Sequence, residues 1–136
     1  MSSIFTKIIQ GDIPCYKIAE CDHAMAFLDI RPLSKGHTLV VPKMEVDRLF
    51  DLPEDEFLAL WAFAHKVAKA IDATIPCNRV GVAVLGFEVP HAHIHLVPLR
   101  TEEELNFAHP KLQLAPEVME EIAALIAHEV SEDILH

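Results

Sequence analysis

The sequence predicts an α+β domain with an antiparallel sheet of about five strands and two helices. Short apolar segments follow one another closely near the start of the chain, and two longer segments repeat apolar residues every three or four positions. The first three predicted strands are too close in sequence for helical crossovers, which favours antiparallel pairing. No repeat or linker divides the 136 residues, so residues 1–136 are expected to form a single domain.

The predicted strands fall into two groups. Residues 16–19 and 24–29 are short apolar segments on either side of a polar turn, and residues 37–41 follow a loop marked by Pro32 and Gly36. The second group, residues 79–85 and 92–97, follows the first long helical segment. Strands therefore dominate the first half of the chain, and a helix, two strands and a final helix follow.

The two predicted helices show apolar residues on one face. Asp51 is expected to cap the first helix and Pro53 to suit its first turn, and Pro76 marks its end. Pro116 is expected to open the second helix. The apolar positions that define the two faces are Phe57, Leu60, Trp61, Ala64, Val67, Ala68 and Ile71 in the first helix, and Val118, Ile122, Leu125, Ile126 and Val130 in the second.

Composition excludes several classes of protein. The net charge of −10 argues against general binding to DNA or RNA, whose backbones are also negative. The apolar segments are far shorter than the roughly 20 residues that a membrane-spanning helix needs. The first residues do not resemble a signal peptide, so a cytoplasmic protein is expected.

The segment Pro-His-Ala-His-Ile-His-Leu-Val-Pro, residues 90–98, carries the strongest functional signal. Side chains alternate between the two faces of a strand, so His91, His93 and His95 are expected to point to one side. The residues between them are apolar and are expected to face the core. This pattern predicts a row of three imidazole rings.

This row of histidines has three possible interpretations. A solvent-exposed histidine face is the least favoured interpretation, because other polar residues suit a strand surface better. A metal site would need further ligands, for which His37, Glu88 and His109 are available. Nucleophilic catalysis is the preferred interpretation, because a neutral imidazole is a nucleophile whose reactive nitrogen is set by the hydrogen bond of the other. Spacing alone leaves the metal site and the nucleophile open.

The row of histidines resembles the His-x-His-x-His-x-x signature, with apolar x, of the histidine triad (HIT) family of nucleotide hydrolases and transferases. Residues 3–14, 26–32 and 36–43 also resemble conserved segments of that family, in the same order. The resemblance extends over residues 3–100, while the last 36 residues are less diagnostic. It implies a HIT-like fold and a homodimer with the long helix at the subunit contact.

The resemblance also implies a role for individual residues. His93 would attack the α-phosphorus of a purine nucleotide and form a nucleotidyl-histidine intermediate, with His37, His91 and His95 around it. Asp29 would bind the ribose hydroxyl groups, and Phe87 and Glu88 would lie in the phosphate loop. The apolar slot for the base would consist of Ile4, Phe5, Ile8, Ile13, Phe27, Ile30 and Leu39.

The implied reaction is hydrolysis of a nucleoside 5′-phosphoramidate or a related compound, which releases AMP or GMP without a cofactor. The alternatives are hydrolysis of dinucleoside polyphosphates and weakly catalytic binding of purine nucleotides. Glu88 makes the last alternative relevant, because the family's phosphate loop usually carries Ser or Thr at this position. A carboxylate there would repel a phosphate unless it pointed away or was protonated.

A second departure concerns zinc. Some relatives bind a structural zinc ion through two N-terminal cysteines, a later histidine and the first triad histidine. The corresponding positions here are Ser3, Thr6, Glu45 and His91, so the thiolate ligands are missing. No metal is therefore expected at this position.

Overall fold

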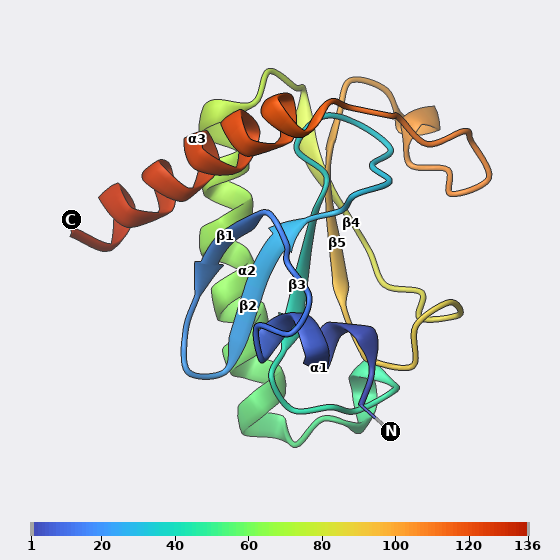
Figure 1. Ribbon diagram of the computed structural model, residues 1–136, viewed down its shortest axis with the longest axis vertical. Coiled ribbons are helices and arrows are strands. Elements are labelled where there is room, and N and C mark those ends of the chain that lie inside the picture. The colour runs from blue at the N-terminus through green and yellow to red at the C-terminus, as the bar shows by residue number, and fades with distance from the viewer. Residues whose placement is uncertain (1, 136) are drawn as a thin grey trace.

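A computed structural model describes residues 2–135 of the protein (Figure 1). Two short 3₁₀ turns, Leu49–Asp51 and Glu102–Glu104, accompany the regular elements. Across residues 2–135, none of the helices combines the length and the apolar character needed to cross a membrane. In chain order the elements are α1 (Ile4–Ile9), β1 (Lys17–Glu20), β2 (Ala24–Leu28), β3 (Thr38–Pro42), α2 (Glu54–Thr74), β4 (Arg79–Ala83), β5 (Ile94–Leu99) and α3 (Pro116–Leu135).

The five strands form one antiparallel sheet in the order β1-β2-β3-β5-β4. Figure 1 shows α2 behind this sheet and α1 in front of it. The predicted α+β class and the antiparallel sheet are therefore confirmed. The strand β5 inserts between β3 and β4, which brings the second half of the chain next to the first.

The two faces of the sheet have separate apolar clusters. Alternate residues of β2, such as Ala26 and Leu28, face α2 and α3 and join the larger cluster. The residues between them, such as Phe27, join a smaller cluster with Phe5 of α1. Because strand residues alternate between faces, β2 and β3 contribute to both clusters.

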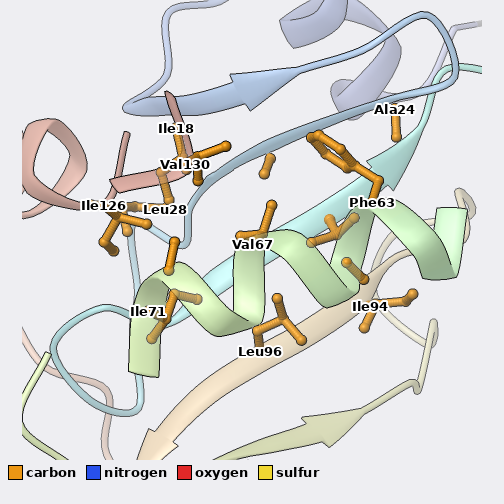
Figure 2. Packing of buried hydrophobic residues seen from close by; sticks show 14 of the residues in the cluster. Ile18, Ala24, Leu28, Phe63, Val67, Ile71, Ile94, Leu96, Ile126 and Val130 are labelled. Carbon is orange, nitrogen blue, oxygen red and sulfur yellow. The ribbon is translucent and has the colours of Figure 1, made fainter. Parts of the chain in front are cut away.

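Figure 2 shows the larger cluster, where α2 lies over the sheet. Val67 and Ile71 of α2 are fully buried, as are Ile94 and Leu96 of β5. The burial of Ile94 and Leu96 fixes which side of β5 faces α2. His95, the residue between them, therefore faces the opposite side of the sheet.

The structure corrects three details of the sequence-based prediction. A short helix, α1, begins at Ile4, where no helix was predicted, and its cap is the Ser3 hydroxyl, which accepts from the Thr6 backbone N–H. The strand β5 begins at Ile94, two residues later than predicted. Asp51 does not cap α2, because it closes the preceding 3₁₀ turn and Pro53 occupies the cap position without a side-chain hydrogen bond.

Packing of α3 against the sheet offers a direct test of the core. Ile126 is fully buried, whereas the neighbouring Leu125 is 48% exposed. We expect Ile126→Ala to lower the free energy of unfolding by about 2–5 kcal/mol, because the cavity it leaves adds to the lost burial. Leu125→Ala is the control and should change this energy by about 0.5 kcal/mol or less. Urea denaturation measures both, and equal losses would contradict this account of the core.

Candidate active site

A cavity of about 490 Å³ contains two of the triad histidines. It lies on the side of the sheet that faces away from α2, between α1, the connection from β4 to β5 and the segment after β5. The residues that line it are Phe5, Asp29, Arg31, Leu39, Leu85, Gly86, Phe87, Glu88, Val89, His93, His95, Phe107, His109, Pro110 and Lys111.

The three predicted histidines form a continuous row. The ring centroids of His93 and His95 are 4.9 Å apart, and the Phe5 ring lies 5.0 Å from His93 and 5.8 Å from His91. His91 and His93 precede β5 but continue its line, and all three side chains are buried. The row that alternation predicted is therefore present.

The hydrogen bonds of His93 determine which of its ring nitrogens is free. Its Nδ1 lies 2.7 Å from the main-chain carbonyl oxygen of His91. A carbonyl oxygen only accepts, so Nδ1 carries the proton and donates it. In the neutral ring, Nε2 then keeps its lone pair. His93 lines the cavity, so this ring is accessible to a ligand there.

A second set of hydrogen bonds orients His37 and His95. The backbone N–H of Leu33 donates to Nδ1 of His37 at 3.0 Å, so the ring proton of a neutral His37 is on Nε2. That nitrogen lies 3.0 Å from Nδ1 of His95 and donates to it. His95 consequently carries its own proton on Nε2, which makes this nitrogen a hydrogen-bond donor.

Burial keeps these rings neutral. The pKa of His37 is lowered from 6.5 to about 3, chiefly by burial and in smaller part by the nearby His95 and Lys111. Burial also lowers the pKa of His95 from 6.5 to about 4, with a further contribution from His93. The pKa of His91 is lowered for the same reason. At neutral pH, these three imidazoles act as neutral donors and acceptors.

Asp29 lies at the end of β2, next to the histidine cluster. Its Oδ2 is 3.6 Å from Nε2 of His37, and its Oδ1 accepts the backbone N–H of Arg31 at 2.9 Å. Burial raises the pKa of Asp29, while the hydrogen bond from Arg31 acts in the opposite direction. The carboxylate is thus held at the cavity by a turn of the main chain.

A family model described as the HIT domain matches residues 10–102. The chain belongs to the HIT family. This match includes all of the sheet and the whole histidine row.

Individual HIT proteins are similar over most of this chain. Adenosine 5′-monophosphoramidase of Schizosaccharomyces pombe is 39% identical, over 98% of this chain and 99% of its own length. The protein of that name in Saccharomyces cerevisiae is 37% identical, over 74% of this chain and 64% of its own length. A crystal structure of a zinc-bound histidine triad family protein from Mycobacterium smegmatis has a TM-score of 0.83 at 29% identity, covering 100% of this chain and 99% of that one.

The positions that correspond to a zinc site in some HIT proteins hold a hydrogen-bonded cluster here. The Ser3 hydroxyl donates to Nδ1 of His91 at 2.6 Å, because Nε2 of His91 donates to the Pro42 carbonyl at 2.8 Å. The Ser3 N–H and the Thr6 hydroxyl donate to Oε1 of Glu45 at 2.7 and 2.6 Å, and these bonds lower the pKa of Glu45. Two hydroxyl groups in place of thiolates do not suit zinc.

Among the side chains that the structure describes, one other group has the composition of a metal site. Ligand atoms of Asp29, His37 and His95 all lie within 4.8 Å of one another. The hydrogen bond between His37 and His95 already occupies the facing nitrogens of these two rings. Glu88 and His109, the other candidate ligands that the sequence offers, line the cavity outside this group.

The predicted base slot of this HIT protein is only partly assembled at the cavity. Phe5, Leu39, Phe87 and Glu88 line it, as does Asp29. The other predicted slot residues do not line it. Phe27 is buried against the Phe5 ring, with centroids 5.8 Å apart, and Ile8 packs against the smaller apolar cluster that contains both rings. Ile4 and Ile30 are 50% and 71% exposed. Ile13 is also absent from the lining. An apolar sequence pattern does not distinguish these environments.

From the segment after β5, sequence reasoning named only His109, as a possible metal ligand, and missed the other residues that line the cavity. Phe107 contacts the edge of His95, with centroids 4.7 Å apart, and lies 6.1 Å from His37. His109, Pro110 and Lys111 complete this wall of the cavity. This segment lacks helical or strand periodicity, and it falls outside the residues that resemble the family pattern. The available signals in the sequence were Phe107 and Lys111, which lie close to Pro110 and Pro116.

The neutral histidines predict a pH dependence of stability. An unfolded histidine binds a proton below about pH 6.5, whereas folded His95 and His37 stay neutral down to about pH 4 and 3. The unfolded state therefore binds more protons in this window, and stability falls as the pH drops through it, by about 1.4 kcal/mol per pH unit for each histidine.

Urea denaturation between about pH 4 and 7 measures this dependence. His37→Asn should reduce the slope of unfolding free energy against pH, while His65→Asn, at an exposed position on α2, should leave it unchanged. Identical slopes in wild type and both variants would contradict the assignment of neutral buried rings.

Proposed function

We propose that this HIT protein hydrolyses nucleoside 5′-phosphoramidates, with His93 as the nucleophile. The observation that carries the proposal is the hydrogen bond from Nδ1 of His93 to the His91 carbonyl, which leaves the lone pair of Nε2 free. The relatives named adenosine 5′-monophosphoramidase support a hydrolase of this type. The activity requires no cofactor in this proposal.

The reaction proceeds in two displacements at phosphorus. Nε2 of His93 forms a bond to the α-phosphorus as the P–N bond to the leaving group breaks, and the departing amine takes a proton from solvent. Water then attacks the same phosphorus, the bond to His93 breaks, and the water proton returns to solvent. The products are a nucleoside monophosphate, an amine and unmodified His93.

Surrounding groups suit the charge changes in these steps. Bonding to phosphorus makes the His93 ring cationic, and its Nδ1–H already donates to a carbonyl oxygen. The Nε2–H of His95, fixed by the hydrogen bond from His37, is available to a phosphoryl oxygen. Because the His91 carbonyl orients His93 and the His37 ring orients His95, little reorganisation is needed during the reaction.

The rest of the cavity suits a purine nucleoside. The Asp29 carboxylate suits the two ribose hydroxyl groups, and the base would lie against apolar side chains such as Phe5, Leu39 and Val89. An apolar surface contributes little discrimination between purines. We therefore propose adenosine and guanosine compounds as substrates.

Replacement of His93 tests the proposed nucleophile. We expect His93→Ala to abolish the nucleotidyl adduct seen by intact-mass spectrometry after mixing with adenosine 5′-phosphoramidate, and to reduce turnover by at least about a thousandfold. His65→Ala, at an exposed histidine on α2, is the matched control and should retain both. An adduct that persists in the His93 variant would overturn the assignment.

Three alternative functions make different predictions. A dinucleoside polyphosphate hydrolase would cleave that substrate faster than the phosphoramidate. A weakly catalytic binding protein would bind AMP without turning over either compound, and exposed Glu88 at the cavity is the feature that favours it. A metal-dependent hydrolase using Asp29, His37 and His95 would lose activity with a chelator.

We also propose a homodimer formed around β4 and α2. Strand β4 lies at the edge of the sheet, so one side of its main chain has no strand partner within residues 2–135. Val82 of β4 is 46% exposed, Val84 and Leu85 directly after the strand are 37% and 51% exposed, and Leu58 of α2 is 59% exposed. An edge strand with exposed apolar side chains is a common site of association.

A charged residue on β4 tests the dimer. We expect Val82→Lys to convert a dimer of the wild type into a monomer, because it places a charge in an apolar contact. Leu125→Lys, on α3, replaces an apolar residue of similar exposure and should leave the dimer intact. Light scattering after size-exclusion chromatography gives both masses, and a monomeric wild type would refute the proposal.

A further inference from the structure

Lys111 is a cation at the cavity that the proposed mechanism does not use. It lies in the irregular segment between β5 and α3, which appears in orange in Figure 1. Its side chain is half-buried and lines the same cavity as His93, His95 and Asp29. No carboxylate among the side chains of residues 2–131 forms an ion pair with it.

The Lys111 ammonium group is held in place by main-chain carbonyls. Nζ donates to the oxygen of Phe107 at 2.5 Å and to that of His109 at 3.0 Å, and it lies 5.9 Å from the centroid of the Phe107 ring. An ammonium group has three N–H donors. Two are used here, and the third has no acceptor among the described residues.

The position of Lys111 relative to the histidine cluster follows from its neighbours. Phe107 lies against both His95 and His37, so the turn that holds Lys111 is attached to the same rings. The charge of Lys111 is close enough to lower the pKa of Asp29 and of His37. Lys111 and His93 also line the same cavity, so the ammonium group is on the wall of the space that a phosphoryl group bound at His93 would occupy.

The charge balance of the cavity explains why such a cation is needed. Its lining contains the carboxyl groups of Asp29 and Glu88, while buried His95 and its partner His37 remain neutral at neutral pH. A nucleotide adds further negative charge at the phosphoryl group, in a chain whose net charge is already −10. Arg31 and Lys111 are the lysine and arginine residues that line the cavity, and Arg31 is exposed.

We propose that Lys111 binds the phosphoryl group of the nucleotide through its third N–H and makes the cavity selective for anionic ligands. This inference rests on the proposed function, because it assumes that a nucleotide occupies the cavity. Lys111 thus determines specificity for the charged phosphoryl group, whereas the apolar wall and Asp29 accommodate the nucleoside.

Comparison of charged and uncharged ligands tests this role. We expect Lys111→Gln to weaken binding of AMP about tenfold or more, and binding of adenosine by about twofold or less, because only AMP carries the anion. Lys111→Arg should retain AMP binding within about threefold, because the charge remains. The salt dependence of AMP binding should be weaker in Lys111→Gln than in wild type. Isothermal titration calorimetry with both ligands measures these changes.

Arg31→Gln is the matched control, because it removes the other cationic side chain of the cavity lining. It should weaken AMP binding by about threefold or less, since Arg31 is exposed and its charge is screened. Equal losses for AMP and adenosine in Lys111→Gln would show that Lys111 only holds the loop, and would overturn the inference. Equal effects of the two substitutions on AMP would overturn it as well.

The proposed function and the inference fail in distinguishable ways. A wild-type protein that does not bind AMP refutes the proposed function, and the inference fails with it. If the wild type binds AMP and the Lys111→Gln variant binds it with the same affinity, only the inference is refuted. Because the readout is equilibrium binding, a change in the rate of the chemical step does not confuse the result.

Discussion

The hydrogen bond between the His93 ring and the His91 carbonyl determines what the cavity can do. A neutral imidazole has one nitrogen with a proton and one with a lone pair, and this bond selects between them. The carbonyl belongs to the main chain of the same row, so the selection does not depend on a flexible side chain. His91 is itself held at both ring nitrogens, by Ser3 and by the Pro42 carbonyl.

This arrangement depends on the two-sided packing of the sheet. The α2 face takes the apolar residues of β5, which forces His95 to the other face. There, α1 and the segment after β5 cover the histidines from two directions through Phe5 and Phe107. The resulting burial keeps His37 and His95 neutral, so the same packing that positions the rings also sets their protonation.

The parts of the structure with a regular period could be predicted from the sequence. Alternation placed His91, His93 and His95 on one side, and the spacing of the early strands gave the antiparallel sheet. The short helix α1 escaped detection because six residues are too few to establish a helical period. Slot residues were harder to predict, since Phe27 and Leu39 share a face of the sheet but only Leu39 reaches the cavity. Lys111 and Phe107 lie in irregular chain, where position depends on tertiary contacts.

The Ser3 hydroxyl has two structural roles, so the thermal stability of the histidine row depends on the first turn of α1. One hydroxyl group both caps α1 and donates to His91, so fraying of the first turn removes the support of the row of rings. A helix of six residues has little stability of its own. On warming, catalytic competence should therefore be lost through partial opening of this end of the molecule while the sheet and α2 are still folded. The working temperature range would then be narrower than the melting temperature suggests.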